Sequence, residues 1–249
     1  MALDLTSEDM DALKDKPGVV SVIEPEFRTF SIKMNTAYGP LADVNLRKAV
    51  SHAFNYKGMM DAAGYAELMV GPLPPGLMSD PKLKVPRTDL EAAKAELALS
   101  KVPDGFSCKV GVSSSAPQVS QFFQALAATV AEMGITIEVE EMPVEQWYDT
   151  IGSPDWGLAY MWYFNATGDP AELISWFLAD GNPASYSNPK VADLLAQQRE
   201  EADPAKRIDL IIEAQQVALA DFPYVPLWWG EAATAINDKY TIEDFGPYT

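Results

Sequence analysis

Cysteine and histidine are almost absent from this sequence. Its 249 residues contain one cysteine, Cys108, and one histidine, His52. No internal disulfide is possible, which fits either a reducing compartment or an exported protein that uses no disulfides. One histidine and one distant cysteine cannot supply a zinc site of the usual kind. A lone helical histidine is more often structural than catalytic, so we expect neither a metal nor a cofactor.

Motifs that mark common enzymes are also missing. The sequence has no Walker loop and no dinucleotide-binding glycine loop, and the serine run 113–115 lacks the flanking glycines of a nucleophile elbow. Carboxylates are abundant, so composition alone leaves a glycosidase-like pair open. Glu138 and Glu140, however, alternate onto the expected wet face of a strand. We therefore expect no catalytic residues, with a carboxylate-dependent hydrolase as the alternative.

Basic residues and long apolar runs are scarce as well. Thirty-six acidic residues against 18 basic residues give a net charge of −18. Such a chain repels phosphate backbones and anionic lipids, which argues against nucleic acid as a partner. No apolar run reaches the roughly 18 residues needed to span a bilayer. Met1 leads directly into an acidic, helix-forming segment, so an exported protein would carry its signal peptide upstream of this sequence.

The hydrophobic pattern that is present indicates an α/β domain. Segment 109–113 predicts a strand, 118–133 predicts a helix with one apolar face, and 135–140 predicts a strand with one wet face. A strand, a helix and a strand at this spacing form a parallel βαβ unit. Cys108 begins the apolar-alternating run 108–112, so we expect a buried thiol there.

The segments before this unit predict two strands and two helices. Residues 19–23 and 27–34 are rich in β-branched and aromatic side chains, which favours strands. Asp43 is predicted to begin a helix that runs to Gly64, because its apolar positions follow helical spacing. Thr88 and Glu91 have the spacing of a capping box at the start of another helix.

The same dipeptide pattern precedes three further predicted helices. An Asx residue is followed by proline at Asp169-Pro170, Asn188-Pro189 and Asp203-Pro204. The Asx side chain caps the helix, and proline takes the first helical position, where no N–H is needed. The last of these helices is expected to end near Ala220, and an extended aromatic segment, 222–229, follows it.

Aromatic side chains gather at the end of the buried strand predicted over 156–164. Trp162 and Phe164 precede the polar loop that begins at Asn165, and Asp169 then caps a helix. Ligands of open α/β sheets gather at the carboxyl ends of strands. An aromatic wall beside a few polar groups suits a small-molecule pocket. Most of these rings are expected to pack in the core, and Trp162, nearest the loop, is the best candidate for ligand contact.

Six short segments carry a resemblance to known proteins: Phe30–Thr36, Leu41–Asn55, Gly71–Gly76, Ala92–Leu97, Tyr186–Leu195 and Phe222–Leu227. Each segment alone is a weak match, but the matches are collinear over nearly all of the chain. Together they resemble one family, the peptide, nickel and oligosaccharide binding proteins of ABC importers (solute-binding family 5).

The resemblance implies a periplasmic-binding-protein-like α/β lobe with a mixed sheet and flanking helices, of the type II, family 5 architecture. Residues 1–31 would be a hinge and first-lobe segment, 32–222 the second ligand-binding lobe, and 223–249 the return crossing toward the first lobe. The chain would thus be incomplete at its N-terminus. The family resemblance further implies a periplasmic protein that captures a small solute and delivers it to a membrane ABC permease.

The expected ligand-binding residues are Trp162, Phe164, Asn165 and Asp169, together with Ser115 and Ala116. Dipeptide-binding members of the family have an arginine where Ala116 stands and an aspartate where Asn165 stands. Without these two charges a zwitterion has no evident partners, and burying an unpaired ion costs several kcal/mol. The solute is therefore expected to be either oligopeptide-like or a neutral, sugar-like molecule. A ligand-sensing receptor domain on a related fold is a further alternative.

Overall fold

Two long strands from opposite ends of the sequence form the middle of the sheet. β1 (Val19–Met34) lies between β5 (Leu158–Phe164) and β6 (Tyr224–Asn237) and is antiparallel to both. The strand order is β2-β6-β1-β5-β3-β4, where β2 is Ala66–Leu68, β3 is Ser107–Ser113 and β4 is Thr136–Met142. This computed structural model describes residues 7–63, 66–74, 77, 82–84, 87–153 and 155–240.

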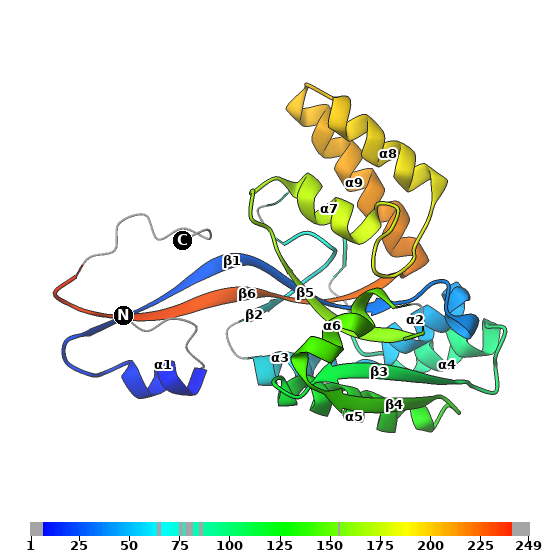
Figure 1. Ribbon diagram of the computed structural model, residues 1–249, viewed down its shortest axis with the longest axis horizontal. Coiled ribbons are helices and arrows are strands. Elements are labelled where there is room, and N and C mark those ends of the chain that lie inside the picture. The colour runs from blue at the N-terminus through cyan, green and yellow to red at the C-terminus, as the bar shows by residue number, and fades with distance from the viewer. Residues whose placement is uncertain are drawn as a thin grey trace.

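β1 corrects the prediction of two separate strands. It is one strand of 16 residues, whose pairing with β6 is irregular between Pro25 and Thr29. Its first half and the last half of β6 form a two-stranded ribbon that extends away from the other helices and strands, with α1 (Ser7–Leu13) beside it (Figure 1). We call residues 19–25 and 231–237 the ribbon.

The predicted βαβ unit is confirmed. β3 and β4 pair in parallel, and α5 (Pro117–Ala131) connects them. Cys108 is buried, as expected. β5 also runs parallel to β3, although it begins at Leu158 rather than at residue 156. The carboxyl ends of β3, β4 and β5 therefore meet at one edge of the sheet.

The larger hydrophobic core joins one face of the sheet to the helices in the first half of the chain. Ile32 and Met34 of β1 pack there with Val110 and Val112 of β3, and all four side chains are buried. The covering helices are α2 (Val44–Ala53), α3 (Tyr56–Ala63), α4 (Leu90–Leu99) and α5, and a short 3-10 helix, Gly39–Ala42, precedes α2.

The helix predicted from Asp43 to Gly64 is two helices in the structure. Asp43 does cap the first, because its side chain accepts a hydrogen bond from the Asn45 N–H at 2.8 Å. Phe54 is extended and ends that helix. Gly64, the predicted end, lies outside the described residues.

The predicted capping box at Thr88 is wrong. Asp89 caps α4 by accepting a hydrogen bond from the Ala92 N–H at 2.9 Å. Thr88 instead stabilises the break between α2 and α3: its hydroxyl donates to the Phe54 carbonyl and accepts from the Tyr56 N–H. A side chain more than thirty positions away in sequence thus forms hydrogen bonds with the backbone on both sides of the break.

A second core lies beneath the three helices predicted from the Asx-Pro pattern. They are α7 (Pro170–Leu178), α8 (Pro189–Glu200) and α9 (Pro204–Asp221), and each Asx side chain accepts a hydrogen bond from the first turn. These helices lie on the opposite side of the sheet from α2 to α5 (Figure 1). Their buried side chains pack with Met161 of β5 and Tyr224 of β6.

One helix, α6 (Val144–Gly152), was not predicted from the sequence. Of its side chains, Trp147 and Thr150 are buried. The side chain of Ile151 packs against both cores. α6 therefore lies at the boundary between the two hydrophobic cores.

Candidate functional site

β5 has a free edge over its carboxyl-terminal half. β1 pairs with β5 from Leu158 to Phe164, whereas β3 pairs with it only at Leu158 and Ala159. Within the described part of the chain, no strand pairs with the other side of residues 160–164. Backbone N–H and C=O groups on an unpaired edge are available to another extended chain.

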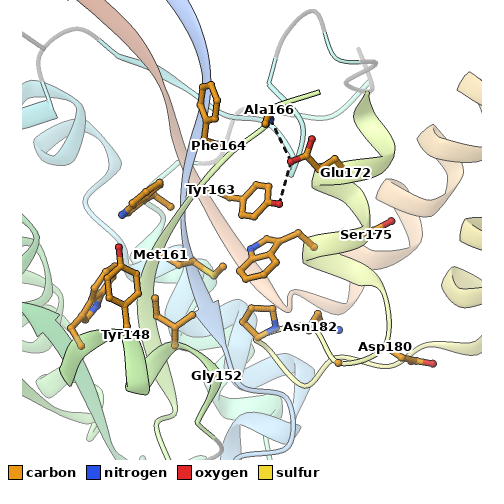
Figure 2. Close-up of a pocket in the computed structure, with 16 residues that line it drawn as sticks. Tyr148, Gly152, Met161, Tyr163, Phe164, Ala166, Glu172, Ser175, Asp180 and Asn182 are labelled. Carbon is orange, nitrogen blue, oxygen red and sulfur yellow. Dashed lines mark hydrogen bonds between the residues drawn. The ribbon is translucent and has the colours of Figure 1, made fainter. Parts of the chain in front are cut away.

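A cavity of about 830 Å³ borders this edge. Four consecutive residues of β5, Met161 to Phe164, line it. Successive side chains of a strand point to opposite faces, so consecutive lining residues place the cavity beside the edge rather than over one face. α6 forms one wall, α7 forms the other, and residues 180–183 close one end (Figure 2).

Aromatic rings form much of the cavity lining. Tyr148 of α6, Trp162 of β5 and Trp176 of α7 line it, and their side chains are 52%, 43% and 37% exposed. Trp176 stacks on Tyr163 with 4.7 Å between ring centroids. Exposed rings gathered in one hollow indicate a ligand-binding surface, because a folded domain normally buries such side chains.

Glu172 of α7 organises the polar end of the cavity. Its carboxylate accepts hydrogen bonds from the Tyr163 hydroxyl at 3.2 Å and from the Ala166 N–H (Figure 2). It also accepts from the Thr167 hydroxyl at 2.6 Å and from the Thr167 N–H. Burial disfavours the carboxylate, but these hydrogen bonds outweigh burial and hold the pKa of Glu172 below its usual value. Glu172 is therefore an anion at neutral pH that fixes both Tyr163 and the loop after β5.

The charges that line the cavity are negative. Glu172 and Asp180 are lining residues, and no lysine, arginine or histidine is among the lining residues of the described chain. The Arg28 guanidinium of the neighbouring strand lies 5.9 Å from the centre of the Trp162 ring. This cation–π contact orients a ring that the cavity leaves half exposed.

Two of the six predicted site residues, Trp162 and Phe164, line the cavity. Asn165 is fully buried, and its side chain donates to the Asp169 carbonyl at 2.8 Å and accepts from the Gly168 N–H at 2.6 Å. Asp169 caps α7 and accepts hydrogen bonds at 2.7 and 3.0 Å from Arg207 of α9. The hydrogen bond from Arg207 lowers the pKa of Asp169 below its usual value. Both residues thus shape the loop that follows β5.

The other two predicted residues, Ser115 and Ala116, follow β3 and are not among the cavity-lining residues. The Ser115 hydroxyl lies 2.7 Å from that of Ser113. Sequence reasoning missed Tyr148, Glu172 and Trp176. Trp176 and Glu172 belong to the helix that Asp169 was predicted to begin, so their proximity to Trp162 was a usable signal. No sequence signal pointed to Tyr148, because α6, the helix that carries it, was not predicted.

The described residues contain no group of three or more histidine, cysteine, aspartate or glutamate side chains placed to hold a metal ion. None of the described helices combines the length and the apolar character that a membrane span requires.

The structure thus defines an α/β domain with a cavity at the free edge of β5, and comparison with known proteins identifies its family. Residues 1–185 match the family model of bacterial extracellular solute-binding proteins, family 5 (middle). This match covers well over half of the chain, so the protein belongs to the family 5 bacterial extracellular solute-binding proteins.

Individual relatives agree with this assignment. The chain is 25% identical to the oligopeptide-binding protein OppA of Bacillus subtilis, with 90% of this chain and 44% of OppA covered. It is 27% identical to the glutathione-binding protein GsiB of Escherichia coli K12, with 91% and 47% covered. The chain thus spans about half the length of these curated relatives.

A solved structure shows the same fold. The periplasmic binding protein DppA of Helicobacter pylori, determined in complex with the peptide STSA, superposes with a TM-score of 0.85 at 21% sequence identity. The superposition covers 98% of this chain and 49% of DppA. The expected periplasmic-binding-protein architecture with a mixed sheet is therefore confirmed.

Proposed function

We propose that this protein is an extracytoplasmic solute-binding component of an ABC importer, and that it binds a peptide-like solute along the free edge of β5. It acts by capture and release, without chemistry. The solute would lie in the aromatic cavity, and a membrane permease would receive it from the closed protein.

The observation that carries this proposal is the combination of a free strand edge and a cavity beside it. An extended peptide adds to an open sheet edge through backbone hydrogen bonds, while pockets take its side chains. Residues 160–164 offer such an edge, and Trp162, Tyr148 and Trp176 offer apolar surface next to it. Recognition of this kind needs no fixed charge at Ala116 or Asn165. The absence of the charges found in dipeptide-binding relatives therefore counts against a dipeptide zwitterion, not against a longer peptide.

The names of the relatives support the same solute class. One relative is an oligopeptide-binding protein and another is a glutathione-binding protein. Both names describe binding, which supports a binder rather than the hydrolase that composition left open.

Within the proposed site the predicted residues have different roles. Trp162 and Phe164 would contact the solute directly, because they line the cavity. Asn165 and Asp169 would act indirectly, by holding the loop from which Glu172 receives its hydrogen bonds. Ser115 and Ala116 would lie at the rim, at the same edge of the sheet as the end of β5.

The ribbon supports the proposed division into lobes, with 32–222 as one lobe and 1–31 and 223–249 leading toward another. A two-stranded ribbon alone is at best marginally stable in water. Val20 and Ile23 of this ribbon are 42% and 41% exposed. Capture would follow if a second lobe at the end of the ribbon closes over the cavity, since a ligand that contacts both lobes favours the closed state.

The test uses the full-length protein from its own host. It is incubated with casein-derived peptides and, separately, with maltodextrins, and bound species are identified by native mass spectrometry. We expect peptides of three or more residues to be retained. Retention of maltodextrins alone would favour the sugar-like solute, and conversion of either pool would favour the hydrolase.

Two controls test the mode of binding. A retained peptide with methylated amide nitrogens should bind about tenfold more weakly or worse, because methylation removes donors that pair with the strand edge, each worth roughly 1 kcal/mol. Trp162→Ala should weaken binding without lowering the melting temperature, since that ring is half exposed. Equal affinity for the methylated peptide would contradict binding along the edge of β5.

A further inference from the structure

Lys33 is a lysine at the centre of the sheet whose side chain is fully buried. It lies in β1 between neighbours that alternate in polarity, so sequence alone places it on a polar, solvent-facing side. Thr29 and Ser31, on the same side of β1, are buried as well. Both faces of this part of β1 are therefore covered, and the ammonium group must find its partners inside the protein.

The path of the Lys33 side chain follows from the strand register. Lys33 is paired with Ala159 of β5, and Ala159 is paired with Gly111 of β3. Paired residues on neighbouring strands lie on the same face of the sheet. Across β1, β5 and β3 the side chains of this row therefore become smaller, from lysine to alanine to glycine. The two small residues leave room for the Lys33 stem to cross them and for α6 to approach, and a Cβ on Gly111 would lie 2.8 Å from Thr150 Cγ2.

The Lys33 ammonium binds the carboxyl-terminal end of α6. Its Nζ donates to the carbonyls of Thr150 at 3.2 Å, Ile151 at 2.5 Å and Ser153 at 3.3 Å. The last carbonyls of a helix have no partner within the helix, and they carry the negative end of its dipole. A cation with three N–H donors matches that site, and no carboxylate of the described residues forms a salt bridge with Lys33.

The bound turn is also a wall of the cavity. Ile151 and Gly152 line the cavity from this turn, and Tyr148 lines it from the turn before. We propose that Lys33 is a positioning residue for solute binding, which holds the last turn of α6 in the place that shapes the cavity. This inference rests on the proposed function, because it takes the cavity as the solute site.

A role in positioning differs from a role in overall stability. Burial removes water from the ammonium and lowers the pKa of Lys33 to about 8, so the charged form is costly in this place. Replacing Lys33 by methionine removes that cost while leaving the α6 carbonyls without their donor. The overall fold should therefore keep its stability while α6 loosens. A residue that merely supported the fold would lower stability everywhere.

The experiment compares Lys33→Met with Lys109→Met in the full-length protein. Lys109 is a matched control, because it lies on β3 two residues before Gly111 but is exposed and pairs with Glu138 and Glu140. Amide hydrogen exchange over 147–153 should be about tenfold faster or more in Lys33→Met at an unchanged or higher melting temperature, since lost end contacts allow local opening. Lys109→Met should exchange like the wild type. Lys33→Gln keeps N–H donors but no charge, so its exchange rate over 147–153 should lie between those of Lys33→Met and Lys109→Met. This variant replaces Lys33→Met if the methionine variant does not fold.

The binding arm measures the fraction of protein that retains a casein-derived peptide at one fixed pool concentration. Retention should fall about tenfold in Lys33→Met and stay unchanged in Lys109→Met, if a displaced wall costs roughly 1.4 kcal/mol of affinity. Unchanged exchange over α6, unchanged retention, or a general loss of protection with a lower melting temperature would each overturn the role of Lys33. If the wild type retains no peptide at all, the proposed function fails, and the exchange arm alone decides whether Lys33 holds α6.

Discussion

At the scale of single residues, the buried charge of Lys33 has a consequence for stability against pH. The pKa of Lys33 is about 8 in the folded protein, against an ordinary 10.5. Between these values the unfolded chain binds the proton more strongly, so the free energy of unfolding contributed by Lys33 rises with pH. The cost of burying the charge is fully present below pH 8, and the difference between the two pKa values corresponds to about 3 kcal/mol.

Urea unfolding of the wild type and Lys33→Met, at about pH 7 and pH 10, measures this effect. The wild type should gain stability relative to the variant as pH rises. Lys109→Met is the control without this gain, because hydrogen bonding to Glu140 and the nearby carboxylates raise the pKa of Lys109, so its contribution to stability stays nearly constant between about pH 7 and pH 10 and is lost only at higher pH. A stability difference between wild type and Lys33→Met that stays constant with pH would show that the Lys33 charge is not buried.

How far residues of the site could be predicted depends on where their partners lie in the sequence. Trp162 and Phe164 were predictable, because a strand end followed by a polar loop is a local pattern. Asn165 and Asp169 were placed at the right loop, yet their side chains bond to the backbone and to Arg207, which no local pattern shows. Lys33 was not predictable at all, since its burial depends on α6, more than a hundred residues away.

At the scale of elements, the three Asx-Pro caps were predicted correctly because a cap is a local device. Two of them now differ in a testable way. Among the described residues, the Asp203 side chain accepts hydrogen bonds only from its own helix, at Ala205 and Lys206. Asp169 caps α7 and also binds Arg207, which joins the start of α7 to α9.

Asp203→Ala should lower the free energy of unfolding by about 1 kcal/mol, the usual value of a cap, and Asp169→Ala by nearer 2 kcal/mol. Asp169→Asn keeps an acceptor for the cap and removes the charge, so its loss in the free energy of unfolding should lie between those of the two alanine variants. Urea unfolding decides the order. Equal losses for the two alanine variants would mean that the half-exposed ion pair with Arg207 contributes nothing, as many surface pairs do.

The approach of α6 to the sheet gives a second prediction for an element. Gly111→Ala would place a Cβ 2.8 Å from Thr150 Cγ2, so α6 must move outward. We expect a loss of about 1–3 kcal/mol in the free energy of unfolding, typical of overpacking. Thr150→Ser removes the crowding methyl and keeps the hydroxyl that donates to the Trp147 carbonyl. The double variant, Gly111→Ala with Thr150→Ser, should recover part of the lost free energy of unfolding. If the losses of the two single variants simply add in this double-mutant cycle, the strain does not arise between these two residues.

The breaks between elements were less predictable than the elements. The helical pattern from Asp43 onward continues through Phe54, so sequence predicted one helix. The chain bends there because Thr88 bonds both sides of the break, and no local feature announces that contact. α6 escaped prediction for a related reason, since its end is held by Lys33 rather than by a cap of its own.

At the scale of the whole molecule, the order of the strands follows from pairings across most of the chain. β1 and β6 pair from Val19 with Asn237 to Lys33 with Tyr224. Sequence indicated extended segments at both ends but not that they are neighbours, because a pairing between such distant segments leaves no local pattern. The βαβ unit was predictable, since its strands are linked by a single helix.

The net charge of −18 leads to a prediction for the protein as a whole. Acidic residues outnumber basic ones two to one, so repulsion between carboxylates exceeds attraction between opposite charges over the molecule as a whole. Their repulsion opposes the compact state, and salt weakens it because the screening length falls to about 10 Å at 0.1 M ionic strength. The melting temperature should therefore rise by several degrees between about 10 mM and 200 mM sodium chloride. Magnesium chloride at equal ionic strength should give the same rise, whereas a larger effect of magnesium would indicate a cation bound at a defined site. A melting temperature that falls with salt would mean that attractive ion pairs, such as Lys190 with Glu213, outweigh the repulsion.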